Sequence, residues 1–152
     1  MSYSIFDVAN WFLSQATMSP KKLQKLCYYA EAWTQTLLKK GLVNDTQFQA
    51  WRHGPVSKEL YQKYKEYGWN NIPMLTGCEN IFADNEPVLN VLYSVWQTYG
   101  DKSANELEAL THQDAPWILA RDRAAANHGD ASQEIILPDD MRAFYGKLYQ
   151  GD

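Results

Sequence analysis

The sequence has few cysteines, no excess of positive charge and no long hydrophobic run. Its 152 residues include only 2 cysteines, Cys27 and Cys78, so no disulfide framework is expected. The formal net charge is -4, which gives no overall basic field to attract nucleic acid. No apolar run approaches the roughly eighteen residues of a membrane span. The first residues contain Asp7 and no basic region, so no signal peptide is expected. These absences predict a soluble, cytoplasmic protein.

Motifs for nucleotide and metal chemistry are also missing. The sequence has neither a phosphate-binding glycine loop nor a dinucleotide-binding glycine motif. None of His53, His112 and His128 lies at a ligand spacing from another histidine or a cysteine. We therefore expect no metal, no cofactor and no catalytic residue. A nucleophile–base pair of Cys78 with His53 or His112 remains an alternative, although nothing in the sequence orients a base. Cys27 lies on an apolar helical stripe and is expected to be a core residue.

The composition that remains is typical of one globular domain. Hydrophobic residues make up 45% of the chain and charged residues 21%, which is enough apolar content for a core. The length fits a single domain covering residues 1–152. Aromatic residues make up 14%. Most of them are expected in the core, but Tyr and Trp are also side chains that protein interfaces favour.

Hydrophobic periodicity and capping residues predict about seven helices. Ser4 with Asp7, and Ser103 with Glu106, have the spacing of a capping box at a helix start. The expected helices cover residues 5 to 14–17, 20–40, 58–67, 85–99, 104–110, 116–124 and 138–148. The second helix has a nearly unbroken apolar stripe and is expected to be central. The inward face of the last helix is expected to hold Met141, Phe144, Tyr145 and Leu148.

A short strand is predicted over residues 48–51, with Phe48 and Ala50 on one face. Gly54-Pro55 follows and requires a sharp turn, for which Gly54 is expected to adopt a positive φ. Ile81-Phe82 is expected to add a small strand beside residues 48–51. The predicted fold class is therefore mainly α, a single compact helical domain of about seven helices with a minor short β element.

Three segments of the sequence, taken in order, resemble the motifs of one known family. They are SPKKLQKLCYY at residues 19–29, AWRHGPV at 50–56 with LY at 60–61, and LTH at 110–112 with PW at 116–117. Together they resemble the Panacea domain, an antitoxin family that includes SocA-like and GepA-like phage-associated proteins. The resemblance extends over roughly residues 7–148. The residues that match the family motifs are Tyr28, Trp51, Gly54, Pro55, Val56, Tyr61, Thr111, His112, Pro116 and Trp117.

The resemblance implies a protein-binding role. A Panacea-like chain would be the antitoxin of a type II-like toxin–antitoxin system and would neutralise a protein toxin, encoded in the adjacent gene, by direct contact. It would be neither an enzyme nor a membrane protein. We expect Lys22, Arg52 and His53 to contact the partner, because Arg52 lies beside a rigid corner and arginine is enriched in binding hot spots. The sequence leaves open whether the toxin is blocked sterically or delivered to a protease, and whether the chain forms homo-oligomers.

Two other interpretations follow from particular residues. Lys21, Lys22 and Lys25 at the start of the second helix form a cationic spot, which as an alternative predicts a DNA-binding regulator. Thr111-His112 with Asp114 is compatible with the acid–base pair of a hydrolase. Local hydrogen bonding at a helix end explains the same three residues without catalysis, and we favour that interpretation.

Overall fold

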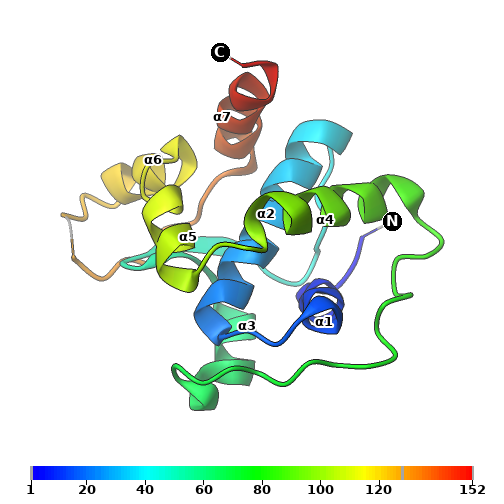
Figure 1. Ribbon diagram of the computed structural model, residues 1–152. Coiled ribbons are helices and arrows are strands. Elements are labelled where there is room, and N and C mark those ends of the chain that lie inside the picture. Colours follow the sequence, from blue (N-terminus) through cyan, green and yellow to red (C-terminus); the bar gives the residue numbers. More distant parts are fainter. Residues whose placement is uncertain (1, 128, 152) are drawn as a thin grey trace.

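The computed structural model describes residues 2–127 and 129–151, and within them it confirms the predicted mainly α fold (Figure 1). The helices are α1 (Ile5–Gln15), α2 (Pro20–Leu38), α3 (Lys58–Tyr64), α4 (Glu86–Tyr99), α5 (Ala104–Thr111), α6 (Ala115–Arg123) and α7 (Pro138–Gln150). A short 3-10 helix, η1 (Lys65–Tyr67), extends α3, and the two strands are β1 (Phe48–Trp51) and β2 (Gly54–Ser57). His128, which was considered as a metal ligand, lies outside the described residues.

Local hydrogen bonds set the starts of two helices as predicted. At α1, Ser4 Oγ accepts from the backbone N–H of Phe6 at 3.1 Å, and Asp7 accepts from the N–H of Ser4 at 3.1 Å. At α5, Ser103 Oγ accepts from the N–H of Glu106 at 3.1 Å, and the Glu106 carboxylate accepts in return at 2.8 Å. Such reciprocal bonds satisfy amide groups that the first helical turn leaves without partners. The sequence therefore predicts these two boundaries reliably.

Helix α2 is the central helix, as predicted. It packs against α1, α3, α4, α5, α7 and β2, and Figure 1 shows these elements arranged around it. Its apolar stripe is fully buried at Leu23 and Leu26. Because other elements cover α2 on several sides, the polar side chains of Gln24, Lys25 and Glu31 are buried as well. Buried polar groups need partners inside the protein, so these three side chains fix neighbouring segments.

Glu31 shows how such a buried group organises a loop. Its carboxylate accepts from the backbone N–H groups of Leu42, at 3.2 Å, and Val43, at 3.1 Å, and from the Gln35 amide at 3.0 Å. Burial raises the pKa of Glu31 above its usual range, while these hydrogen bonds act in the opposite direction. The side chain therefore positions the segment that leads from α2 to β1.

Strands β1 and β2 form an antiparallel hairpin in which Trp51 pairs with Gly54. Arg52 and His53 form the connecting turn. The predicted strand over residues 48–51 is confirmed, and its buried positions are Phe48 and Ala50. The corner at Gly54-Pro55 is thus the start of a second strand and not only a turn.

The prediction that Ile81-Phe82 forms a strand beside β1 is wrong. Those residues lie in a turn, and the Phe82 ring is buried against Tyr3 with 4.5 Å between ring centroids. The far edge of β1 instead meets the chain before α7, where Ala50 N donates to Glu134 O at 2.8 Å and Ile136 N donates to Phe48 O at 2.8 Å. An apolar pair such as Ile81-Phe82 has no local feature that distinguishes burial in a turn from burial in a strand.

The long connection over residues 69–85 runs past α1, as Figure 1 shows. It is held by backbone hydrogen bonds from Ile72 N to Met18 O, at 2.8 Å, and from Leu75 N to Leu13 O, at 3.0 Å. On the last helix, Met141 and Tyr145 are buried as predicted, but Leu148 is 53% exposed. The inward orientation expected for Leu148 is therefore wrong, because the last turn of α7 extends past the core.

Candidate functional site

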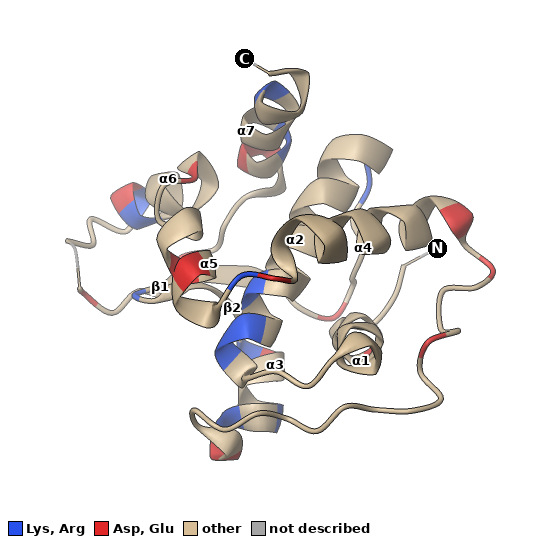
Figure 2. Cartoon of the chain, viewed as in Figure 1, with Lys and Arg blue, Asp and Glu red and all other residues tan. Residues whose placement is uncertain are grey.

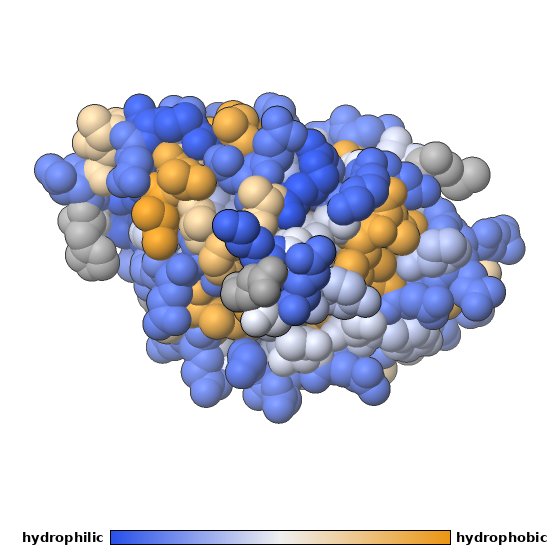
Figure 3. All heavy atoms as spheres, turned by 90° about the horizontal axis from the view of Figure 1, so that it is seen from above, coloured by the Kyte–Doolittle hydropathy of each residue, from blue (hydrophilic) through white to orange (hydrophobic). Residues whose placement is uncertain are grey.

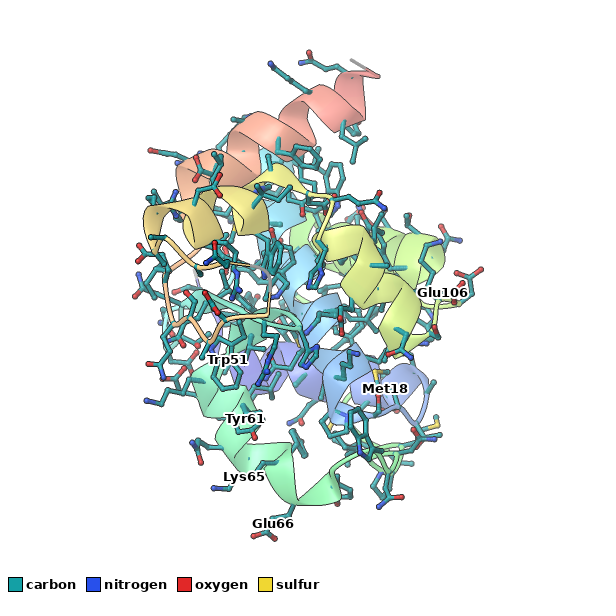
Figure 4. All side chains as sticks on the ribbon, turned by 90° about the vertical axis from the view of Figure 1, so that its left-hand side faces the viewer. Met18, Trp51, Tyr61, Lys65, Glu66 and Glu106 are labelled. Atoms are coloured by element: carbon teal, nitrogen blue, oxygen red, sulfur yellow. The ribbon has the colours of Figure 1, made fainter. Side chains whose placement is uncertain are left out.

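A groove of about 710 Å³ lies beside the hairpin, between the start of α2, α3 and residues 131–133. We call it the hairpin groove. Its aromatic and apolar walls include Leu23, Trp51, Val56, Leu60, Tyr61, Tyr64 and Trp69. The rings of Trp51 and Tyr61 are 5.0 Å apart, and Figure 4 shows Trp51, Tyr61 and Lys65 following one another along this side of the molecule.

Lys25 lies beneath the hairpin, close to Gly54. Lys25 lines the groove although only 1% of the residue is exposed, and its Nζ donates to the Pro55 carbonyl at 3.2 Å. Gly54 has the predicted positive φ, at +111°. A Cβ atom on residue 54 would lie 2.6 Å from Lys25 Cε and 3.0 Å from Thr111 Oγ1. Only glycine combines this backbone conformation with so close an approach of β2 to the lysine side chain.

Burial changes the acid–base behaviour of Lys25. The pKa of Lys25 is lowered to about 7, mainly because burial removes water from around the ammonium group; the positive charge of Lys21 also lowers it, and Glu108 acts in the opposite direction. The side chain therefore passes between its charged and neutral forms near neutral pH. No feature of the sequence around Lys25 indicates this, because a lysine in the first turns of a helix is normally solvated.

The edge of β2 that faces away from β1 is held by a side chain of α2. The Gln24 amide donates to the Ser57 carbonyl at 2.9 Å, and Gln24 Oε1 accepts from the Ser57 N–H at 2.9 Å. This pair of bonds repeats the pattern by which a neighbouring strand would bind β2. Gln24 therefore fixes the hairpin against α2, and with it one wall of the groove.

Helix α6 holds the end of β1 from the other side. Trp117 Nε1 donates to the Trp51 carbonyl at 2.9 Å, and Arg121 donates to the Ala50 carbonyl at 3.1 Å. The Trp117 ring stacks on His112 with 4.0 Å between centroids, and the Arg121 guanidinium lies 5.1 Å from the same ring. Three of the motif residues, Trp51, His112 and Trp117, thus meet at the end of β1.

Asp114 belongs to a buried cluster of tyrosines. Its Oδ2 accepts from Tyr29 at 2.9 Å and from Tyr145 at 2.8 Å, and the Tyr145 hydroxyl lies 3.1 Å from that of Tyr28. Burial raises the pKa of Asp114, and burial is also the main cause that raises the pKa values of the tyrosines. The expectation that Asp114 bonds locally at a helix end is wrong, because its side chain makes no capping bond. Thr111 does bond locally, to the Glu108 carbonyl at 2.9 Å.

The structure brings together two of the three residues expected to contact a partner. Arg52 and His53 are exposed on the hairpin turn and line the groove, and His53 Nδ1 lies 3.4 Å from a Glu108 carboxylate oxygen. Lys22 lies elsewhere, half-buried beside α4, and donates to the Gly100 carbonyl at 2.6 Å. Burial lowers the pKa of Lys22. A partner contact of Lys22 stays a prediction, but its amine already has a structural role.

The three lysines at the start of α2 do not form one exposed patch. Figure 2 shows positive residues gathered there and along α3, but the contacts of the three side chains differ. Lys21 pairs with Glu108 at 2.5 Å and with Asn105 at 2.8 Å, while Lys25 is buried. The prediction that Lys25 belongs to a cationic spot at the start of α2 is therefore wrong, because the hairpin and α5 cover that side of the helix.

Sequence reasoning missed two side chains of the groove. Trp69 is 86% exposed, and Lys65 lines the groove from η1. Trp69 belongs to the connection after Gly68, which has no hydrophobic periodicity, and Lys65 lies near the end of the helix predicted over residues 58–67, where a lysine is normally a solvated surface residue. A usable signal was present, since Trp69 directly follows the helix-ending Gly68 and precedes Asn70 and Asn71, with no apolar neighbour to pack against.

The comparison with protein families agrees with these motifs. The family described as Antitoxin SocA-like, Panacea domain, matches residues 23–118. That range is more than half of the chain and contains the hairpin, Thr111-His112 and Pro116-Trp117. The chain therefore belongs to the SocA-like Panacea-domain family. No curated protein and no solved structure matches it.

Two further properties bear on the expected classes of site. Within residues 2–127 and 129–151, no group of three or more His, Cys, Asp or Glu side chains is arranged to hold a metal ion. Among the helices described, none combines the length and hydrophobicity that crossing a membrane requires.

Cys27 is buried in the core as predicted, and burial raises the pKa of its thiol. Cys78 is half-exposed in the connection before α4.

Proposed function

We propose that the chain is the antitoxin of a type II-like toxin–antitoxin system and that it neutralises a protein toxin by direct contact. The observation that carries this proposal is membership of the SocA-like antitoxin family over residues 23–118. The toxin would be encoded in the adjacent gene, as expected for a phage-associated system. We further propose that residues 1–152 act as one antitoxin domain, since one buried cluster extends from Ile5 to Tyr145. Binding requires no catalytic group, and we assign no reaction to the chain.

The proposed contact surface is the hairpin turn together with the hairpin groove. Arg52 and His53 are exposed there, and the neighbouring walls present Tyr61 and the 86% exposed Trp69. Tryptophan, tyrosine and arginine are the residue types that most often dominate binding energy at interfaces. The turn is also rigidly supported, because Trp117 and Arg121 bond the last carbonyl groups of β1. A rigid surface loses little conformational entropy when it binds.

Co-expression with the product of the neighbouring gene tests this proposal. We expect that product alone to stop growth and the wild-type chain to restore it. Trp69→Ala and the double variant Arg52→Ala with His53→Ala should lose rescue while keeping the wild-type melting curve. Tyr149→Ala is the matched control, because it removes another exposed aromatic ring far along α7 and should keep rescue.

The outcomes separate the class of protein from the surface. Full rescue by the folded variants would reject the proposed surface and leave the antitoxin role in place. If no neighbouring product is neutralised and the chain instead shifts its upstream promoter DNA in a salt-sensitive way, the antitoxin role is rejected in favour of DNA regulation. Toxin abundance during rescue distinguishes the mechanisms, since delivery to a protease lowers it and steric blocking does not.

A further inference from the structure

The hairpin groove has an unusual charge composition for this protein. The described residues that line it include five basic side chains and no Asp or Glu. The basic residues are Lys21, Lys25, Arg52, His53 and Lys65. The whole chain has 18 acidic residues against 14 Lys and Arg, so its average surface has the opposite sign. The groove is therefore a local basic site on an acidic protein.

Two of these cations are available to a partner. Among the ion pairs between described residues, none involves Arg52 or Lys65. Lys21 and His53 share one carboxylate, that of Glu108, which belongs to α5 and does not line the groove. Arg52 lies on the hairpin turn and Lys65 on η1, so the two charges lie at separate places along the groove.

Between the charges, the groove offers aromatic walls. Trp51 and Tyr61 pack against each other, and Trp69 is largely exposed. Cations spaced along aromatic walls complement a polypeptide that carries both carboxylates and apolar side chains. The cations favour a negatively charged partner, and burial of apolar side chains against the aromatic rings supplies affinity. Duplex DNA offers phosphates on a polar backbone and nothing to fill such walls. The chemistry therefore favours an acidic polypeptide segment.

We propose that the hairpin groove binds an acidic segment of the toxin, in which Asp or Glu residues alternate with apolar residues. This inference rests on the proposed antitoxin function. The carboxylates pair with Arg52 and Lys65, and the apolar side chains pack against Trp51, Tyr61 and Trp69.

Peptide probes test the ligand class directly. We would titrate the full chain with a short peptide of alternating Glu and Leu, and with the same peptide containing Gln in place of Glu, and follow the tryptophan indole signals by NMR. The Glu peptide should shift the signals of Trp51 and Trp69 and bind at least about tenfold more tightly than the Gln peptide at low salt. Its advantage should shrink as salt rises. The indole of Trp11, which is fully buried, serves as the internal reference.

A charge-reversal pair and its matched control complete the experiment. Arg52→Glu with Lys65→Glu should abolish the preference for the Glu peptide. Lys40→Glu with Lys147→Glu changes the net charge equally at exposed sites outside the groove and should keep the preference. Equal binding of both peptides, shifts that bypass the groove, an equal loss in the control, or a duplex oligonucleotide that binds more tightly than the Glu peptide would each overturn the inference.

Rescue of growth separates this inference from the antitoxin role. If the wild type and the folded Arg52→Glu, Lys65→Glu variant rescue equally, the acidic-segment inference is wrong and the antitoxin role stands. If the Glu peptide binds the groove but the wild type neutralises no neighbouring product, the antitoxin role is wrong, and the toxin is rejected as the occupant.

Discussion

Lys25 Cε lies so close to Gly54 that a Cβ atom added to residue 54 would be only 2.6 Å from it. The same position is 3.0 Å from Thr111 Oγ1. This one contact therefore joins the central helix α2, the start of β2 and the end of α5. Two of the motif residues of this chain, Gly54 and Thr111, therefore lie close together although they are far apart in the sequence.

Gly54→Ala should destabilise the protein by more than the roughly 1 kcal/mol of an ordinary backbone effect, because it adds a steric clash to an unfavourable φ. Gly77→Ala is the matched control, since Gly77 also has a positive φ, +84°, but has nothing within 4 Å of an added Cβ. Urea denaturation of both variants measures the difference. Equal losses of stability would show that Lys25 and Thr111 can move away from the added methyl group without lowering the free energy of unfolding.

Gln24→Glu should lower the free energy of unfolding by about 1–3 kcal/mol, because it keeps the size of the side chain but removes the amide donor to Ser57 and buries a carboxylate. Gln62→Glu makes the same chemical change at an exposed position of α3 and should be nearly neutral. If the two variants unfold at the same denaturant concentration, Gln24 does not hold the edge of β2.

Tyr145→Phe should cost about 1–3 kcal/mol of stability, because Asp114 loses one of its two tyrosine donors inside the core. The ring stays, so packing changes little. Tyr149→Phe, on the exposed side of α7, is the control and should leave the melting curve unchanged. A Tyr145→Phe protein as stable as the wild type would mean that Tyr29 and Tyr28 re-form the cluster around Asp114 without loss.

Stability should rise with pH between about 7 and 10 because of Lys25. Its pKa is about 7 in the folded chain, against about 10.4 for an unfolded lysine, so in this range the unfolded state binds more protons. Below pH 7 both states are charged and the full cost of burying the ammonium is present. Each unit of difference in pKa corresponds to about 1.4 kcal/mol.

Lys25→Met provides the test of that rise. Denaturant titrations at several pH values should show the increase in the wild type and in Lys147→Met, which removes an exposed lysine, but not in Lys25→Met. The charged groups that act on the pKa of Lys25 are Lys21 on α2, which lowers it, and Glu108 on α5, which raises it. An unchanged slope in Lys25→Met would assign the pH dependence to another group.

The sequence by itself determined the local features of this protein. Ser4 with Asp7 and Ser103 with Glu106 define helix starts, because both capping partners lie within one turn of the chain. Gly54 defines a left-handed backbone position before Pro55 for a similarly local reason. The apolar stripe of α2 predicted its central place, since a helix with so wide a stripe must be covered on several sides.

Only the tertiary structure decided which partners the remaining side chains meet. Lys25 is buried because the hairpin and α5, distant in sequence, cover α2 at that point. Asp114 bonds tyrosines 85 and 31 residues away, and no local pattern indicates such a bond. β1 pairs with β2 on one edge and with the chain near residue 135 on the other. Phe82 lies in a turn, and its ring is buried in the core. Pairing of this kind depends on the register and packing of distant segments, which hydrophobic periodicity does not specify.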